Sequence, residues 1–342
     1  MVALLTLKNA SKVYTSGMVR QRSITALQET TLSIGDGKPR ITAIVGESGS
    51  GKTTMGMLIL GFIRPTGGTI LFEGKNLWKV SRPVWKEYRR QVQAIFQDPF
   101  EVYNPFYKVD HMLEVPIIKF KMSRTKRERR VMIEDALKAV GLRPEETLGR
   151  YPHQLSGGQR QRIMVARALV LQPKVIIADE PVSMVDASLR ATMLKSLQAL
   201  RDEQGISILY ITHDLATAYH ISDNILILYQ GRVVEAGDAN LVITEPQHPY
   251  SQLLVGSIPW PDPDLKWGEA EQVTVHREKP SEFGCPFAPR CRHVMDICRQ
   301  KAPQFYQTDT TRAVECFLFQ SSPILDKDQI DTVLCSEYDQ VQ

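Results

Sequence analysis

Short apolar runs separated by helix-like stretches dominate the hydrophobic pattern of this chain. Ile41–Val45 and residues 175–178 are apolar at nearly every position, as is typical of strands buried on both faces of a sheet. Residues 206–211 form a third such run, and the stretch before it, Ala187–Gln204, has the pattern of a helix. Strand, helix and strand in this order predict a parallel β-sheet.

The flanking segments extend this α/β pattern. Residues 4–7 and 26–34 carry β-branched and apolar side chains and predict further strands. Residues 84–175 predict mostly helices. Asn224–Tyr229 and residues 232–236, joined at Gln230-Gly231, predict a small β-hairpin. The predicted fold class is therefore α/β, with a mostly parallel sheet and an inserted helical segment.

A basic run covers residues 119–130 within the helical part. It leads into an amphipathic helix whose apolar side chains are Val131, Ile133, Leu137 and Val140. The simplest interpretation is a solvated helix face, and a DNA-binding patch is the alternative.

Length and charge narrow the class of protein. At about 150 residues per domain, 342 residues suggest roughly two domains. A net charge of +4 is too small to argue for nucleic-acid binding. No apolar run approaches the roughly 20 residues of a transmembrane helix, and residues 1–10 lack the pattern of a secretory signal. We therefore expect a cytosolic protein that reaches a membrane only through a partner.

All five cysteines lie near the C-terminus. Cys285, Cys291, Cys298 and Cys316 have the spacing C-x5-C-x6-C-x17-C, and Cys335 stands apart. Such a cluster in a cytosolic protein favours metal binding over disulfides. Zinc sites prefer closer pairs of cysteines, whereas four widely spaced thiolates suit a [4Fe–4S] cluster. Zn²⁺ and plain buried cysteines stay as alternatives. We expect a domain boundary upstream, in the Pro-rich stretch 259–263.

A glycine-rich loop with a lysine follows the first buried strand. The segment Gly46-Glu47-Ser48-Gly49-Ser50-Gly51-Lys52-Thr53 fits the phosphate-loop pattern G-x-x-x-x-G-K-[ST], and a helix is predicted over residues 53–62. The glycines let backbone N–H groups surround a β-phosphate, and the helix N-terminus adds a favourable dipole. Lys52 is expected to reach the β- and γ-phosphates of ATP, and Thr53 to bind Mg²⁺. Thr54 is expected to belong to the same nucleotide-binding set.

Two carboxylates end the buried strand at residues 175–178. Asp179 at the strand tip is suited to hold Mg²⁺. Glu180, one residue further on, is suited to polarise the attacking water as general base. The two acids behind a phosphate loop predict an ATPase site.

A second glycine-rich turn, Leu155-Ser156-Gly157-Gly158-Gln159, precedes an amphipathic helix predicted over residues 159–171. Ser156 is a favourable N-cap, and the two glycines leave the first N–H groups of the helix bare. This is an anion site with no lysine of its own. An incomplete site of this kind makes sense if it completes the ATP site of another subunit.

These motifs resemble those of the ATP-binding subunits of ABC transporters, which have a P-loop ATPase core. Further motifs follow in that family's order. The resemblance implies that Gln97 senses Mg²⁺ and the attacking water, and that His213 contacts the γ-phosphate. It also implies that Asp186 belongs to the loop that crosses a dimer interface, and that Tyr14 stacks on adenine.

The branch that the chain resembles most is that of the dipeptide and oligopeptide importers. The segments that carry this resemblance are Phe96-Gln97-Asp98-Pro99-Phe100 with Asn104-Pro105, Tyr151-Pro152-His153-Gln154, His248-Pro249-Tyr250 and Gly284-Cys285-Pro286-Phe287. It implies an ATPase domain over residues 1–258, with a helical subdomain at about 98–165. It also implies an importer-type extension over 259–320, in which the four cysteines hold an iron–sulfur cluster, and it leaves a tail over 321–342.

The resemblance implies an enzyme that hydrolyses ATP at the cytoplasmic face of the cell membrane. The implied partners are a second ABC ATPase subunit in a heterodimer, two permease subunits and an extracytoplasmic solute-binding protein, with no nucleic acid. The chain looks more like the second of the two ATPases. The implied cargo is a dipeptide or oligopeptide, with oligosaccharides and nickel as alternatives. A non-transport ABC ATPase is less favoured because no sustained heptads lie between Lys52 and Leu155. The complete motif set also disfavours an iron–sulfur electron carrier.

Overall fold

The computed structural model describes residues 3–16, 22–98, 104–183, 185–258 and 283–334. The predicted domain boundary at residues 259–263, the separate Cys335 and the end of the tail lie outside the described residues.

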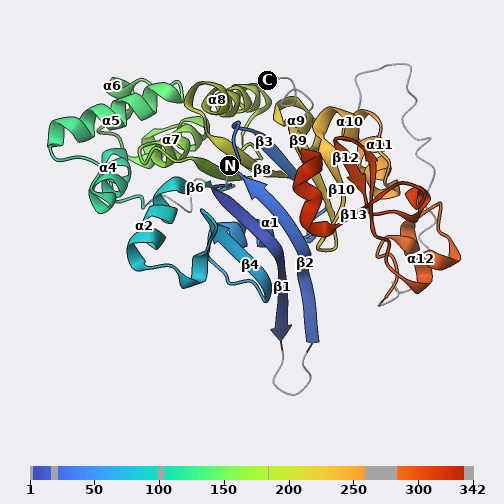
Figure 1. Ribbon diagram of the computed structural model, residues 1–342. Coiled ribbons are helices and arrows are strands. Elements are labelled where there is room, and N and C mark those ends of the chain that lie inside the picture. The colour runs from blue at the N-terminus through green and yellow to red at the C-terminus, as the bar shows by residue number, and fades with distance from the viewer. Residues whose placement is uncertain (1–2, 17–21, 99–103, 184, 259–282, 335–342) are drawn as a thin grey trace.

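A nine-stranded sheet forms the centre of the molecule (Figure 1). Its strands β6, β7, β8, β3 and β9 run parallel, and the strands beyond β9 pair antiparallel. In spatial order they are β6 (Val92–Ile95), β7 (Val175–Asp179), β8 (Ser207–Thr212), β3 (Ile41–Val45), β9 (Asn224–Tyr229), β10 (Arg232–Asp238), β12 (Arg312–Val314), β11 (Phe305–Asp309) and β13 (Ile324–Leu325). The predicted mostly parallel α/β core is confirmed.

The β9–β10 hairpin follows the prediction. Tyr229 pairs with Arg232 across the turn, and Gln230 and Gly231 have φ values of 45° and 77°. Two consecutive positive φ values are typical of the tight turns that match the twist of a hairpin.

Strand β6 was not predicted, because it lies inside the segment interpreted as mostly helical. It has only four residues, includes the polar Gln93, and pairs with β7 alone at the edge of the sheet. A strand of this length is too short for its pattern of apolar residues to distinguish it from the end of the preceding helix.

A second, antiparallel sheet has the order β2-β1-β4-β5. Its strands are β1 (Leu5–Ser16), β2 (Arg22–Ile34), β4 (Gly67–Phe72) and β5 (Lys75–Asn76). Strand β1 is longer than the predicted strand at residues 4–7. Its second half is polar and increasingly exposed, so apolar periodicity could not reveal it.

Helices cover both faces of the central sheet. The α-helices are α1 (Lys52–Ile59), α2 (Arg82–Gln91), α4 (Val109–Phe120), α5 (Lys126–Ala139), α6 (Pro144–Thr147), α7 (Gly157–Leu169), α8 (Ala187–Gln204), α9 (Leu215–Ile221), α10 (Ala239–Thr244), α11 (Pro249–Gly256) and α12 (Asp296–Gln300). The 3₁₀ turns are η1 (Leu77–Lys79), η2 (Pro152–Gln154), η3 (Ala288–Arg290), η4 (Phe317–Phe319) and η5 (Lys327–Leu334). Helix α1 ends before the predicted residue 62, because Gly61 takes a left-handed φ of 69° that ends the helix.

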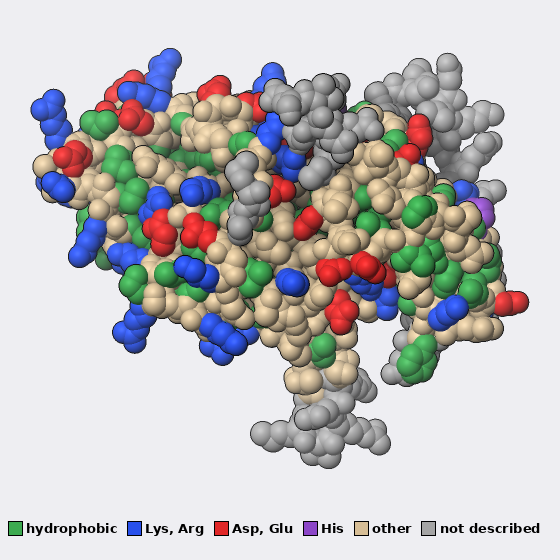
Figure 2. Space-filling model, viewed as in Figure 1, with side chains coloured by type: hydrophobic (Ala, Val, Ile, Leu, Met, Phe, Trp, Pro, Cys, Tyr) green, Lys and Arg blue, Asp and Glu red, His purple; other side chains and the backbone are tan. Residues whose placement is uncertain are grey.

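Helices α4 to α7 lie together at one end of the molecule (Figure 1). Helix α5 begins with a capping box between Thr125 and Glu128, and it buries Ile133 and Leu137. Val131 is half exposed, which corrects its place on the predicted apolar face. Figure 2 shows basic side chains at this end interspersed with acidic ones. Arg130, for example, pairs with Glu134 at 2.6 Å, as expected of a solvated helix face.

The C-terminal segment continues the central sheet. Strand β12 pairs with β10, aligning Val314 with Glu235. Turn η5 buries Ile330 and Val333 in the apolar core beside the β1–β2 sheet, and the backbone N–H of Ser33 donates to Oδ1 of Asp331 at 2.8 Å. The last described segment is therefore packed against the N-terminal strands. No helix among the described residues is long and apolar enough to cross a membrane.

Candidate active site

The phosphate-loop pattern lies at the carboxyl end of β3, between that strand and α1. Gly51 forms the N-cap of α1 with a φ of 107°, and a Cβ atom there would lie 2.4 Å from the carbonyl oxygen of Ala26. No L side chain fits this backbone conformation and this close approach. Ser48 and Gly49 are exposed at the loop surface. Ser50 Oγ is buried without a hydrogen-bond partner among the described residues.

Lys52 is the charged centre of the loop. Its Nζ donates hydrogen bonds to the carbonyl oxygens of Gly46 (2.7 Å) and Glu47 (2.9 Å). Burial lowers the pKa of Lys52, while the nearby carboxylates of Glu180, Asp179 and Glu47 act in the opposite direction. The ammonium group is thus held inside the loop by neutral carbonyl groups that an anion could replace.

The predicted acidic pair ends strand β7. Asp179 is its last residue, and burial together with the charge of Glu180 raises the pKa of Asp179. Glu180 takes a φ of 46°, and its backbone N–H donates to the carbonyl of Ile211 on β8 at 2.8 Å. A left-handed backbone at a non-glycine residue is strained and occurs often at functional sites.

His213 directly follows β8 and contacts Glu180. Its Nδ1 lies 2.7 Å from Oε1 of Glu180, and the His213 side chain is 60% exposed while that of Glu180 is 18% exposed. The structure therefore brings together two predicted catalytic residues.

The remaining predicted residues of this edge are solvent-accessible. Gln97 follows β6 and is exposed, as is Thr53 in the first turn of α1, and Thr54 is half-buried. In the strand order β3-β8-β7-β6, the carboxyl ends of these parallel strands share one edge of the sheet. Hydroxyl and carboxylate oxygens of the kind carried by Thr53 and Asp179 are ligands that Mg²⁺ prefers.

The second glycine-rich turn opens helix α7. Ser156 Oγ accepts from the N–H of Gln159 at 3.2 Å, and Gln159 Oε1 accepts from the N–H of Ser156 at 3.0 Å, which forms a capping box. Gly157 is exposed. A Cβ on Gly158 would lie 2.5 Å from Cδ1 of Leu189, so this glycine packs against α8. The turn thus makes contacts with its own helix and with α8.

Two family profiles match the chain. The ABC transporter family matches residues 27–183, and the C-terminal region of oligopeptide/dipeptide transporters matches residues 234–298. The dipeptide transport ATP-binding protein DppF of Escherichia coli is 40% identical over 288 residues, which are 83% of this chain and 84% of that protein. The protein of the same name from Haemophilus influenzae is 38% identical over 303 residues, which are 87% and 90% of the two chains.

The chain belongs to the ATP-binding subunits of ABC transporters. A solved relative has the same fold: the ATP-binding cassette MJ0796, in a dimeric post-hydrolysis state with ADP and Pi, aligns with a TM-score of 0.60. That alignment has 29% identity and covers 69% of this chain and 98% of the cassette. The chain is therefore an ATPase built on the predicted P-loop core.

Two further residues that were predicted to bind nucleotide do not lie at the carboxyl ends of the parallel strands. Tyr14 is on β1, is 42% exposed, and has Lys12 Nζ 5.2 Å from the centre of its ring. Asp186 is the N-cap of α8 and is exposed, without a side-chain capping bond. Both side chains are exposed, and within the described residues neither forms a hydrogen bond or ion pair with the phosphate loop.

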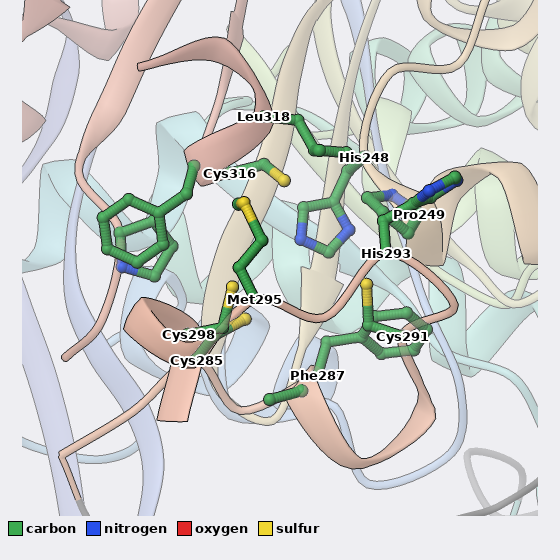
Figure 3. A pocket seen from close by; sticks show the side chains of 13 residues that line it. His248, Pro249, Cys285, Phe287, Cys291, His293, Met295, Cys298, Cys316 and Leu318 are labelled. Atoms are coloured by element: carbon green, nitrogen blue, oxygen red, sulfur yellow. The ribbon is translucent and has the colours of Figure 1, made fainter. Parts of the chain in front are cut away.

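The four clustered cysteines line one pocket in the C-terminal region (Figure 3). Cys285, Cys291, Cys298 and Cys316 are free thiols, and His248, Met295 and Phe287 complete part of the lining. Burial raises the pKa of Cys285 to about 11 and that of Cys316 to about 12, and it also raises the pKa of Cys291. Burial therefore favours the protonated thiol at Cys285, Cys291 and Cys316.

The distances between possible metal-ligating side chains test the predicted metal site. Within the part of the chain that the structure describes, no three His, Cys, Asp or Glu side chains are close enough to hold a metal ion. The arrangement supports neither a zinc site nor the predicted iron–sulfur cluster. The [4Fe–4S] cluster stays a prediction.

Sequence reasoning missed one pair of contacts at the phosphate loop. Arg290, from the cysteine-lined region, forms two hydrogen bonds with the carboxylate of Glu47, both of 2.9 Å. Tyr250 Oη accepts from the backbone N–H of Glu47 at 2.9 Å. The signal that could have pointed to Arg290 is its position just before Cys291, but no sequence rule links that turn to residue 47.

Proposed function

We propose that this subunit binds Mg²⁺–ATP at an interface with a second ATP-binding subunit and that hydrolysis there powers uptake of dipeptides or oligopeptides. The observation that carries the proposal is the separation of two half-sites on one chain. The phosphate loop shares a sheet edge with Asp179, Glu180 and His213, whereas the turn at Ser156 opens α7 and packs on α8. The first half-site has the lysine and the carboxylates, and the second has only a helix N-terminus with its Ser-Gly-Gly turn.

In the first half-site, Lys52 exchanges its carbonyl partners for the β- and γ-phosphate oxygens of ATP. The N–H of Glu47 donates to Tyr250 Oη and that of Ser50 to the carbonyl of Glu47, so the remaining N–H groups of the loop and the N-terminus of α1 would bind the same phosphates. Thr53, Asp179 and Gln97 are the residues that would hold Mg²⁺. Bound there, the ion would supply positive charge that offsets the charge developing on the phosphate oxygens.

Glu180 acts as general base toward the attacking water in this proposal. Its carboxylate is largely shielded from solvent. His213 forms a hydrogen bond with this carboxylate and orients it. His213 then contacts the γ-phosphate when the site closes. Gln97 positions the water from the neighbouring strand end.

The second half-site serves the partner's nucleotide. Ser156, Gly157 and Gly158 offer an N-cap hydroxyl and helix N–H groups to the γ-phosphate, with Gln159 fixing the turn and Asp186 at the interface. The exposed Tyr14 ring stacks on adenine. The solved MJ0796 cassette, a dimer bound to ADP and Pi, supports this sandwich.

The names of the relatives support the cargo and the assembly. DppF of both organisms is a dipeptide transport protein, and the C-terminal profile is that of oligopeptide/dipeptide transporters. We propose that the chain pairs with a second ATPase in a heterodimer on two permease subunits. The complex lies at the cytoplasmic face of the membrane and receives cargo from an extracytoplasmic solute-binding protein.

Uptake in cells that lack this chain tests the cargo. Labelled dipeptides and tetrapeptides are supplied in one arm and labelled oligosaccharides in the other. Peptide uptake should be lost and then restored by the wild-type chain and by Lys195→Ala, an exposed lysine on α8, but not by Lys52→Ala. Loss of oligosaccharide uptake alone would overturn the peptide assignment, and full rescue by Lys52→Ala would overturn the role of the phosphate loop.

The cysteine pocket is proposed to hold a [4Fe–4S] cluster. Four thiols around one largely apolar pocket suit an iron–sulfur cluster, whose iron atoms bind thiolates. In a [4Fe–4S] cluster each iron binds a different cysteine, so the four cysteines need not be close neighbours. Bound there, the cluster would hold Cys285, Cys291, Cys298 and Cys316 together as a structural staple. Anaerobic purification should give about four iron and four sulfide per chain, lost in Cys316→Ser. Stoichiometric zinc without sulfide would overturn the cluster.

A further inference from the structure

An ion pair joins the C-terminal region to the phosphate loop. Arg290 Nη1 and Nη2 lie 2.9 Å from Oε2 and Oε1 of Glu47, across 243 positions of sequence. This is a bidentate pairing, in which the planar guanidinium fixes both the position and the orientation of the carboxylate. The Arg290 side chain is 27% exposed and that of Glu47 is 41% exposed.

The Arg290 guanidinium is itself held in place. It lies 5.6 Å from the ring centre of Phe287 and 5.8 Å from that of Tyr229, at cation–π distances. Arg290 ends the turn η3, and its backbone N–H donates to the carbonyl of Phe287 at 2.9 Å. The residues on either side of this turn, Cys285 and Cys291, line the cysteine pocket. The guanidinium is therefore held by Phe287 of the C-terminal region and by Tyr229 at the end of β9, in addition to its bonds with Glu47.

Glu47, the partner of Arg290, is also in contact with the lysine of the phosphate loop. Its carbonyl accepts from Lys52 Nζ, and its N–H donates to Tyr250 Oη. Its carboxylate is near enough to Lys52 to favour the charged ammonium electrostatically. A carboxylate that stabilises this ammonium also repels the phosphates that the ammonium binds. An unpaired Glu47 would therefore weaken the site.

We propose that Arg290 is a positioning residue of the ATP site, which holds and neutralises Glu47 so that the phosphate loop accepts ATP. The inference rests on the proposed binding of ATP by this loop. It makes the cysteine-lined region part of the nucleotide site, since the arginine comes from the turn between two of the pocket's cysteines. The class of ligand affected is a nucleoside di- or triphosphate, because both place a β-phosphate in the loop.

A nucleotide titration of the full-length chain tests this role. The dissociation constants of a fluorescent N-methylanthraniloyl-ATP and of ADP are measured for wild type, Arg290→Gln, Glu47→Gln and the double variant. Arg143→Gln is the matched control, because Arg143 forms an exposed 2.9 Å pair with Glu146 in the helical segment. Urea unfolding midpoints are recorded for every variant to detect loss of fold.

Arg290→Gln should weaken binding about tenfold, because it leaves one uncompensated negative charge beside the phosphates. Adding Glu47→Gln should restore affinity to within about threefold of wild type, because that charge is gone. A merely structural role for Arg290 would lower the unfolding midpoint and would not be rescued at residue 47.

The remaining outcomes contradict the inference. Unchanged affinity in Arg290→Gln overturns it, and so does weakened binding that Glu47→Gln fails to restore. If the wild-type chain and Arg143→Gln also fail to bind nucleotide, the proposed function fails as well, so the two failures are distinguishable.

Discussion

Nδ1 of His213 lies 2.7 Å from Oε1 of Glu180, although the two residues are 33 positions apart in sequence. Strands β7 and β8 are parallel neighbours, with Asp179 aligned to Ile211, so the first residues after each strand meet at the sheet edge. The contact fixes the position of the Glu180 carboxylate at this edge. Two catalytic predictions follow from this pairing.

Glu180→Gln should hydrolyse ATP about 10²–10⁴-fold more slowly while binding it nearly as well as wild type, because an amide cannot accept the proton of the attacking water. Phosphate release and a nucleotide titration measure the two properties. Glu203→Gln, at an exposed position on α8, is the control and should behave as wild type. Turnover by Glu180→Gln near the wild-type rate would remove Glu180 from the role of base.

His213→Ala should lower kcat by about 10²-fold with KM for ATP changed by less than about threefold, since the histidine orients the base and contacts the γ-phosphate only when the site closes. The double variant His213→Ala/Glu180→Gln should be no slower than Glu180→Gln alone, because the two residues act as a unit. Multiplicative losses in the double variant would mean that His213 acts independently of Glu180.

Ile330→Ala should destabilise the ATPase core, although it lies near the C-terminus. Ile330 is 1% exposed and packs in the cluster beside the N-terminal sheet. Truncating a buried isoleucine costs about 2–5 kcal/mol in the free energy of unfolding. The control Ile324→Ala, at a side chain that is 59% exposed, should cost far less. Equal urea midpoints for the two variants would show that η5 does not belong to the core.

Asp331 predicts a pH dependence of stability. Burial and the charge of Asp36 raise the pKa of Asp331 above its usual 3.8, so the folded state binds this proton more tightly than the unfolded state. Its contribution to stability is therefore present at low pH and is lost as the pH rises from about 4 through the raised value.

Asp331→Asn keeps an acceptor for the N–H of Ser33 and removes the charge. It should be at least as stable as wild type at pH 7, and its advantage should shrink toward pH 4. Asp331→Ala, which also loses the acceptor, should be less stable than Asp331→Asn at every pH. Urea unfolding between pH 4 and 8 measures this, and an Asp331→Asn deficit that grows with pH would reverse the assigned sign.

The sequence predicted where Asp179 and Glu180 lie because they follow an apolar run that is plainly a strand, whereas His213 was named only through the family resemblance. Ile41–Val45, Ala187–Gln204 and Asn224–Tyr229 have the bounds that the structure gives them. Once those strands were known to be parallel, the meeting of Glu180 and His213 followed from strand adjacency alone.

The parts that could not be predicted depend on long-range packing. Strand β6 is too short to show an alternation of apolar and polar residues. The pairing of β12 with β10 joins segments that lie on either side of residues 259–282 in the sequence. The contact of Arg290 with Glu47 and that of Asp331 with Ser33 depend on how the C-terminal region folds back. No spacing within either segment specifies its distant partner.

The docking of η5 on the N-terminal strands also fixes when the protein can fold during its synthesis. Strands β1 and β2 leave the ribosome first, yet Ile330, Val333 and Leu334 complete the apolar cluster beside them. At roughly 5–20 residues per second, those strands wait tens of seconds with apolar surface uncovered. The nascent chain therefore exposes this apolar surface until η5 emerges, and ribosomes that stall before residue 327 should leave an aggregation-prone product.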